Sequence, residues 1–378
     1  MEALILTCGT GGGHNTAAKA VQEALLRQGD HATVLNPYTL CGGKMEKRID
    51  RTYISLVQKW PGLFGFVYQL GNAYRNLPFP SPIYHLSRNM AAVLDEYLRA
   101  HPADVVVTTH LYPGEMLTQM KNQGMQVPKT VFVATDYTCI PFTEELSCDG
   151  YIIPTERHRA EFVKRGVPAE KIYPFGIPVR GGFSEDISKK DAKKTLGLLP
   201  DKRYILLCGG SMGAGKIDKT VGMLLEKKPT DAELIVICGS NEMLYSRLFR
   251  KYGTAVNLLK TTDKMAYYLR ACDLYLSKPG GLSSTEAAVA GVPLVHLPPI
   301  PGCETINARF FSENGMSCRF TASPKNVQKL LTLLDSRQTQ TEMAENQKKI
   351  IRKDGAQQIA AYLQRLCGTE TEPQGGNA

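Results

Sequence analysis

Short, almost purely apolar runs alternate along the chain with longer stretches whose apolar residues recur every third or fourth position. The short runs are typical of strands buried on both faces of a parallel sheet, and the longer stretches of helices that cover such a sheet. The short runs lie at 31–35, 104–109, 130–135 and 150–155, and again at 204–208, 234–238, 273–277 and 293–297. This pattern predicts an α/β protein with two doubly wound parallel sheets.

Each half of the chain begins with a strand, a glycine-rich loop and a helix. The first loop spans residues 9–13 and the second spans 209–215, and a segment rich in proline and glycine, residues 173–186, joins the halves. We therefore expect two Rossmann-like domains that face each other across a cleft, at residues 1–178 and 179–365. The small, polar tail at 366–378 is expected to be disordered.

Both glycine loops are candidates for phosphate binding, because backbone N–H groups and a helix N-terminus attract anions. The second loop and Lys216 fit a nucleotide triphosphatase motif, but Ile217 stands where the Mg²⁺-binding Ser or Thr belongs. In the first loop His14 replaces the last glycine of a dinucleotide fingerprint, and Asn36 stands where an acidic ribose ligand is expected. The sequence thus disfavours a metal-dependent triphosphatase and a NAD enzyme.

The composition of the chain favours some kinds of binding partner over others. A net charge of +9 and a pI near 8.9 favour an anionic partner, either a phosphate ligand or a membrane surface. No run reaches the roughly 18 apolar residues of a membrane span, and the first residues do not resemble a signal peptide. We expect a cytoplasmic protein with no nucleic-acid partner.

Five motifs carry a family resemblance: GTGGGH at 9–14, TDY at 135–137, FGIPVR at 175–180, GGSMGAG at 209–215, and the glycine- and proline-rich segment 277–311. In this order they resemble the processive diacylglycerol glucosyltransferases and monogalactosyldiacylglycerol synthases, which have the GT-B fold, over the chain to about residue 365. The resemblance implies inverting transfer of a hexose, with glucose favoured, from a UDP-sugar to a membrane lipid such as diacylglycerol. It implies a peripheral enzyme on the inner face of the cell membrane, without metal or other cofactor, and the sequence contains no D-x-D motif.

The resemblance also implies which residues bind the donor. Cys303 replaces the glutamine of the family's P-G-Q-E-x-x-N motif, which leaves the sugar preference open. Ser284, Lys216 and Lys278 are additional candidates for phosphate contacts. The donor-binding residues so implied are Gly13, Gly210, Ser211, Met212, Gly213, Gly280, Gly281, Ser283, Glu286, Cys303, Glu304 and Asn307.

Glu286 has two interpretations. Ser283 and Glu286 form the S-x-x-E pattern of a helix capping box, in which the glutamate satisfies a backbone N–H. In the family that the chain resembles, the glutamate at this position holds the ribose hydroxyls of UDP. We favour ribose binding, because a helix start is also where a nucleotide phosphate binds.

His14 and Asp136 are the candidate catalytic residues. His14 ends the first glycine loop, and Asp136 follows the strand at 130–135, where active sites of α/β proteins lie. The sequence does not decide which of the two is the base, and a structural histidine and a turn-capping aspartate are the alternatives. His110, which follows the strand at 104–109, has less support.

Other functions remain open at this point. One is transfer from UDP-N-acetylglucosamine to another lipid-linked acceptor, and another is a UDP-sugar 2-epimerase. Such epimerases carry G-T-R-P-E near the start, whereas this chain has GTGGGH. A nucleotide-binding protein without catalysis would explain the glycine loops but not the polar residues beside the donor.

Residues 55–89 form a long connection that suggests how a lipid is reached. The single tryptophan, Trp60, is followed by Phe64 and other apolar residues, with Lys59, Arg75 and Arg88 around them. Aromatic side chains flanked by cations suit the interface of an anionic bilayer. The alternative is that these residues fill the core of the first domain.

Overall fold

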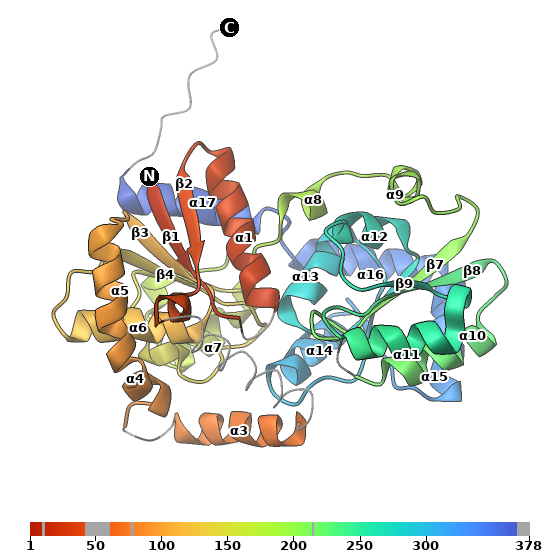
Figure 1. The fold of residues 1–378 in the computed structure, drawn as a ribbon, viewed down its shortest axis with the longest axis horizontal. Coiled ribbons are helices and arrows are strands. Elements are labelled where there is room, and N and C mark those ends of the chain that lie inside the picture. The colour runs from red at the N-terminus through yellow and green to blue at the C-terminus, as the bar shows by residue number, and fades with distance from the viewer. Residues whose placement is uncertain (10–11, 42–60, 76, 78, 214, 369–378) are drawn as a thin grey trace, which may run out of the picture.

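The computed structural model describes residues 1–9, 12–41, 61–75, 77, 79–213 and 215–368. Figure 1 shows two α/β domains side by side, each built on one six-stranded sheet. The prediction of two doubly wound, Rossmann-like domains is confirmed. Trp60, Lys59 and the residues from 369 onward lie outside the described residues.

The first sheet has the strand order β2-β1-β3-β4-β5-β6, and its paired strands all run parallel. The chain leaves β1 for one edge and returns beside β1 as β3, which creates the switch point where ligands bind at the carboxyl ends of strands. The strands are β1 (Glu2–Leu6), β2 (His31–Leu35), β3 (Val105–Thr108), β4 (Lys129–Val133), β5 (Gly150–Ile152) and β6 (Ile172–Tyr173).

The second sheet repeats this plan with the order β12-β11-β10-β7-β8-β9. Its switch point lies between β7 and β10, which are parallel neighbours. The strands are β7 (Arg203–Cys208), β8 (Ala232–Ile237), β9 (Asn257–Leu259), β10 (Leu274–Ser277), β11 (Leu294–His296) and β12 (Cys318–Arg319).

The central strands are apolar throughout because helices cover both faces of each sheet. In β1, for example, Ile5 and Leu6 are both fully buried but pack into different apolar clusters. The helices of the first domain are α1 (Gly12–Arg27), α3 (Pro61–Tyr74), α4 (Pro82–Leu86), α5 (Arg88–Ala100), α6 (Leu111–Asn122) and α7 (Arg159–Lys164).

The last helix crosses back from the second domain to the first. Ile359 and Leu363 of α17 are fully buried in the cluster that contains Val21 and Leu25 of α1. Residues 355–365, which were predicted to belong to the second domain, therefore pack with the first, and the helix continues to Cys367, past the predicted start of the tail. The remaining helices are α8 (Gly181–Ser184), α9 (Lys189–Leu196), α10 (Ile217–Lys227), α11 (Glu242–Tyr252), α12 (Met265–Ala271), α13 (Gly281–Ala290), α14 (Cys303–Glu313), α15 (Pro324–Asp335), α16 (Arg337–Ile350) and α17 (Gly355–Cys367).

Helix α3 lies at the lower edge of the first domain, and one of its ends extends toward the second domain (Figure 1). A Cβ on Gly65 would collide with Pro301 of the second domain, whereas one on Gly71 would meet Pro141 and Phe142 of the first at 3.5–3.7 Å. Glycine at the first position therefore permits a close approach between α3 and the loop before α14. Within the described part of the chain, no helix is long and apolar enough to cross a bilayer.

Candidate active site

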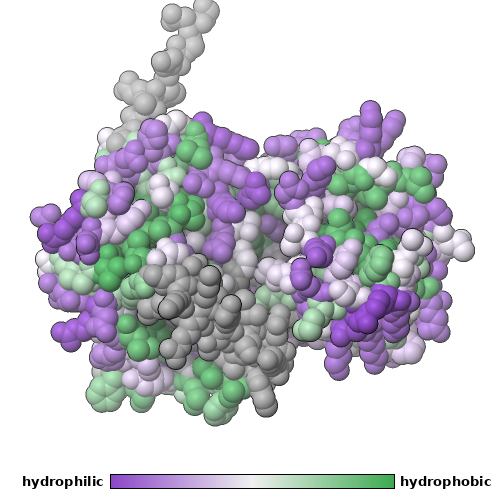
Figure 2. All heavy atoms as spheres, viewed as in Figure 1, coloured by the Kyte–Doolittle hydropathy of each residue, from purple (hydrophilic) through white to green (hydrophobic). Residues whose placement is uncertain are grey.

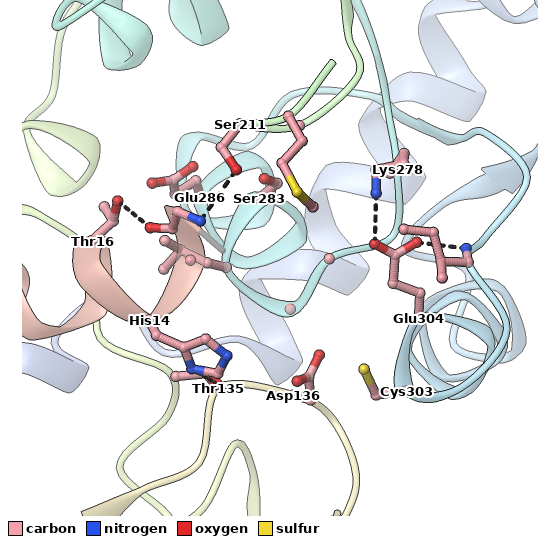
Figure 3. A pocket seen from close by; sticks show the side chains of 18 of the residues that line it. His14, Thr16, Thr135, Asp136, Ser211, Lys278, Ser283, Glu286, Cys303 and Glu304 are labelled. Carbon is pink, nitrogen blue, oxygen red and sulfur yellow. Dashed lines mark hydrogen bonds and ion pairs between the residues drawn. The ribbon is translucent and has the colours of Figure 1, made fainter. Parts of the chain in front are cut away.

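A cavity of about 260 Å³ lies where the carboxyl ends of the two sheets face each other. Figure 3 shows side chains from both domains pointing into it. Both predicted catalytic residues and most predicted donor-binding residues line this one cavity. They are His14, Asp136, Gly13, Gly210, Ser211, Met212, Gly280, Gly281, Ser283, Glu286, Cys303 and Glu304.

Three helices begin at this cavity. The first residues of α1, α13 and α14 all line it, so the positive ends of three helix dipoles point inward. The expected helix after the second glycine loop does not contribute in this way, since Ile217 at the start of α10 is buried and Lys216 is exposed outside the lining. A bound anion would thus meet α13 and the backbone of residues 209–212 instead of α10.

The glycine loops of the two domains touch each other. The backbone N–H of Gly12 donates a hydrogen bond of 3.1 Å to Ser211 Oγ (Figure 3), and a Cβ on Gly12 would lie 2.7 Å from Ser211 Cβ. Glycine in the first loop therefore allows the two domains to close on the cavity.

Glu286 lies inside α13 and faces the cavity. The helix begins at Gly281 with Gly280 as its N-cap, so Ser283 is not an N-cap and the capping-box interpretation is wrong. No described residue donates a hydrogen bond to the Glu286 carboxyl, which leaves its oxygens open to a ligand. Burial raises the pKa of Glu286 to about 8, and the positive charge of Arg180 acts in the opposite direction.

Besides Lys216, two expected phosphate contacts are not in the cavity. Ser284 is fully buried and its hydroxyl lies 3.0 Å from His296 Nε2. Gly213 has a φ of 55° and packs so closely against the Cys238 carbonyl that a side chain would not fit. These two residues shape α13 and the second glycine loop, and they do not line the cavity.

Lys278, a candidate for phosphate binding, forms an ion pair with Glu304. Its Nζ lies 3.0 Å from Glu304 Oε1, and both side chains are largely buried. The other carboxylate oxygen, Oε2, accepts a hydrogen bond of 2.7 Å from the backbone N–H of Ile300. The ion pair holds Glu304 in one orientation at the start of α14 and lowers the free-energy cost of burying the Glu304 carboxylate.

His14 has a defined tautomer. Its Nδ1 lies 2.8 Å from the Thr109 backbone carbonyl, which can only accept, so Nδ1 carries the proton and Nε2 keeps its lone pair. Burial lowers the pKa of His14, so the ring is neutral at pH 7. The His110 ring lies 4.5 Å away, but its Nδ1 accepts a hydrogen bond from the Tyr112 N–H and caps α6.

Asp136 follows β4 and faces α14 of the other domain. Asn307 Nδ2 donates a hydrogen bond of 2.7 Å to Asp136 Oδ1. Burial raises the pKa of Asp136 to about 6, and the negative charge of Glu304 acts in the same direction. The Asn307 hydrogen bond acts in the opposite direction. The carboxyl therefore holds a charge at neutral pH yet remains basic.

Asn307 itself is fully buried and does not line the cavity. Its amide is engaged by Tyr137, Asp136 and Pro279, so the expectation that it faces the donor sugar does not fit this structure. Of the motif at residues 135–137, Asp136 was predicted to have a role, and the structure adds Tyr137, whose backbone N–H binds Asn307.

A second cavity, of about 240 Å³, opens from the first domain and was not predicted. It shares His14, Thr135, Asp136 and Cys303 with the first cavity. Its walls come from α3, the start of α6 and the loop after β4, which lie far apart in the sequence. Apolar and aromatic side chains form most of it, including Val67, Tyr68, Ile83, Leu111, Tyr112, Phe132, Ile140, Pro141 and Phe142.

Both halves of the chain match models of glycosyltransferase families. Residues 14–179 match the model of the monogalactosyldiacylglycerol synthase family, and residues 204–359 match the C-terminal domain of glycosyltransferase family 28. The chain therefore combines segments of these two families, which together span most of its length. The predicted resemblance is confirmed, and so is the prediction of a UDP-sugar-dependent transferase.

Relatives of the chain match over most of its length. A processive diacylglycerol beta-glucosyltransferase of Bacillus pumilus is 27% identical over 365 residues, covering 94% of this chain and 92% of that one. Another with the same name, from Staphylococcus carnosus, is 29% identical over 247 residues, or 64% of this chain and 62% of the relative.

Solved structures show the same fold at low identity. MurG of Acinetobacter baumannii superposes with a TM-score of 0.63 at 18% identity, over 96% of this chain and 99% of that one. MnaA of S. aureus in complex with UDP gives a TM-score of 0.66 at 13% identity, over the full length of both chains.

Proposed function

We propose that this protein transfers a hexose, with glucose favoured, from a UDP-sugar to the hydroxyl of a diacylglycerol-type lipid, with inversion at the anomeric carbon. One observation carries the proposal: a cavity between the domains and an apolar cavity in the first domain meet at His14, Thr135, Asp136 and Cys303. A polar donor and a lipid acceptor need separate compartments that share a reaction point. The names of the relatives favour glucose and diacylglycerol.

The donor would bind in the first cavity. The start of α13 and the backbone of residues 209–212 would hold the diphosphate, and Glu286 would accept hydrogen bonds from the ribose hydroxyls. Glu304 and Cys303, at the start of α14, would face the sugar. Because helix ends and backbone N–H groups meet the charge of the leaving UDP, the proposed mechanism does not require a metal.

The acceptor would enter through the second cavity, whose apolar lining suits an acyl chain. Tyr68 projects from α3 into this cavity near Asp136 and Cys303. A lipid that lies along α3 would bring its free hydroxyl to the junction of the two cavities.

At the junction, the lipid hydroxyl oxygen attacks the anomeric carbon and its proton passes to Asp136. The bond between the anomeric carbon and the UDP oxygen breaks, and its electron pair leaves with UDP. A base with a pKa of about 6 is largely ionised at neutral pH, which suits proton transfer there. His14 Nε2, with its lone pair, is the second group at the junction that accepts a proton or a hydrogen bond.

An apolar surface on α3 and α4 would dock on the membrane. Leu63, Phe66, Val67 and Leu70 recur at the spacing of one helix face, and each is about half exposed. Figure 2 shows apolar atoms gathered along the lower edge of the first domain, where Figure 1 places α3 and α4. The exposed side chains of this surface, here called the α3–α4 surface, are Leu63, Phe66, Val67, Leu70, Leu77, Phe79 and Leu86.

Anionic lipid is the partner that the net charge of +9 favours for this surface. Arg88 is exposed next to it, whereas Arg75 is buried and paired with Glu144, which corrects the expectation that Arg75 faces lipid. Trp60 and the side chain of Phe64 lie outside the described residues. The proposed location is the inner face of the cell membrane.

The test is a transfer assay with radiolabelled UDP-glucose, UDP-galactose and UDP-N-acetylglucosamine, each with and without diacylglycerol in mixed micelles and with EDTA. We expect a glycosylated lipid from UDP-glucose, formed only with diacylglycerol and retained in EDTA. If only UDP-N-acetylglucosamine supported transfer, the donor would be that sugar nucleotide and not UDP-glucose. If a UDP-sugar were epimerised in the absence of lipid, the protein would be an isomerase.

A further inference from the structure

Asn307 uses its whole amide to join the two domains. Its Oδ1 accepts a hydrogen bond of 2.8 Å from the backbone N–H of Tyr137, and its Nδ2 donates to Asp136 Oδ1 at 2.7 Å and to the Pro279 carbonyl at 3.0 Å. The side chain is fully buried. Asn307 therefore touches no part of the cavity and acts on Asp136.

The orientation of this amide follows from its partners. The Tyr137 N–H can only donate, so it must face Oδ1, and the Pro279 carbonyl can only accept, so it must face Nδ2. The group that faces Asp136 is therefore an N–H donor, which favours an ionised carboxyl.

Asn307 also links Asp136 to the donor side of the site. It lies one helical turn after Cys303 and Glu304 on α14, and both of these line the donor cavity. The loop that carries Asp136 belongs to the first domain. One amide thus fixes the carboxyl relative to the helix that begins at the donor sugar.

Tyr137 holds the same loop in place from the next residue. Its hydroxyl lies 2.6 Å from Thr285 Oγ1 of α13, and its ring stacks on Phe310 of α14 with centroids 5.0 Å apart. The side chain belongs to the apolar core of the second domain. The backbone on the C-terminal side of Asp136 is therefore anchored independently of Asn307.

We propose that Asn307 is a positioning residue that holds Asp136 toward the acceptor hydroxyl only while the two domains are docked. This inference rests on the proposed function, in which Asp136 takes the acceptor proton. It replaces the expectation from the family resemblance that Asn307 faces the donor sugar. Opening of the cleft would separate Asp136 from its amide partner and leave the acceptor hydroxyl without an oriented base.

The test compares Asn307→Asp with Asn314→Asp. Both make the same chemical change on α14, and Asn314 also forms a hydrogen bond across the domain boundary, with Arg157, but at the far end of the helix.

In Asn307→Asp, a carboxylate replaces the N–H donor that faces Asp136. The two carboxyl groups repel each other when both are ionised, so they share a proton and the pKa of the pair rises. We expect kcat to fall by about 10²-fold or more, as when a base is impaired. The acid limb of kcat should move to higher pH and the Kd for UDP-glucose should stay within about twofold, while Asn314→Asp keeps the wild-type profile.

A change confined to KM and Kd for UDP-glucose, with both raised and the pH profile unchanged in a variant of normal melting temperature, would overturn the proposal and make Asn307 a donor-binding residue. A second measurement does not depend on enzymatic activity, so it tests the positioning role even if the proposed function is wrong. The carboxyl of Asp136 is titrated by ¹³C NMR of Asp-labelled protein and assigned with Asp136→Asn. An upward shift in Asn307→Asp supports the positioning role even if wild-type protein transfers no sugar, and an unshifted titration overturns it.

Discussion

The Cα of Gly281 at the start of α13 lies directly against the backbone carbonyl of Thr135 in the other domain. A Cβ at this position would overlap the carbonyl oxygen and lie 3.1 Å from the Cα of Asp136. Helix α13 and the loop after β4 in the first domain thus meet at a point where only hydrogen fits.

This contact predicts a strong effect of Gly281→Ala. The added methyl group forces the domains apart, and overpacking of this kind costs about 1–3 kcal/mol, or about 5- to 150-fold in kcat/KM if closure precedes transfer. Steady-state kinetics measures this loss. Gly182→Ala is the control, because a Cβ there meets Ala266 at an ordinary 3.8 Å. Equal activity of both variants would show that the closed arrangement is not needed.

Asp136→Asn should lower kcat by about 10²- to 10⁴-fold, since an amide takes no proton from the acceptor hydroxyl. The Kd for UDP should be nearly unchanged. In the wild-type enzyme a base with a pKa of about 6 is protonated below that pH, so kcat should fall about tenfold for each pH unit below 6. The variant His14→Gln shows which of the two residues, His14 or Asp136, is the base. If His14 is the base instead, Asp136→Asn keeps most of the turnover and His14→Gln loses it.

Binding of UDP-glucose should release a proton from Glu286. Burial raises the pKa of this carboxyl to about 8, so it is mostly protonated at pH 7, whereas ribose hydroxyls donate to the ionised form. Affinity should therefore rise between pH 6 and 8 and level off above. Calorimetry at pH 7 in buffers of different ionisation enthalpy measures the released proton.

Glu286→Gln is the control for this linkage, because it keeps the shape but does not titrate. It should abolish the proton release and weaken UDP-glucose by about 1–3 kcal/mol. Unchanged affinity in the variant would show that Glu286 does not bind the ribose.

The α3–α4 surface predicts membrane binding by the first domain. Replacing Phe66 and Leu70 together with serine removes two apolar side chains that are 59% and 51% exposed, so the fold should be little affected. Sedimentation with phosphatidylglycerol vesicles should decrease at least severalfold, and the apparent KM for lipid should increase. The matched control replaces Met243 and Phe249 of α11 in the second domain, which are also exposed. An equal decrease in both pairs would argue against a dedicated surface.

Much of the fold could be predicted from the sequence because buried parallel strands are apolar throughout and glycine loops follow them. The packing of α17 could not, since an amphipathic pattern shows that a face is buried but not which surface buries it. Glu286 lines the cavity, whereas Gly213 and Asn307, which come from the same motifs, do not. Motif spacing does not show which way a side chain points.

The second cavity could not be predicted from the sequence for a similar reason. Its walls come from α3, α6 and the loop after β4, and no periodicity relates Tyr68 to Phe142 before the chain is folded. Residues 55–89 did stand out as a long apolar connection. Its two interpretations, core and membrane surface, differ only in the exposure of the side chains. In the structure Tyr68 of α3 lines the second cavity, Leu63, Phe66 and Leu70 are exposed, and Val67 does both.

The most direct measurement is the anomeric configuration of the lipid product made from UDP-α-glucose and diacylglycerol in vesicles. NMR of the purified product should show a β-glucosyl lipid for the wild type, and Asp136→Asn should give almost none while still binding UDP. An α-glucosyl lipid would contradict in-line attack from the second cavity. Release of glucose or of an epimerised sugar with no lipid product would contradict transfer altogether.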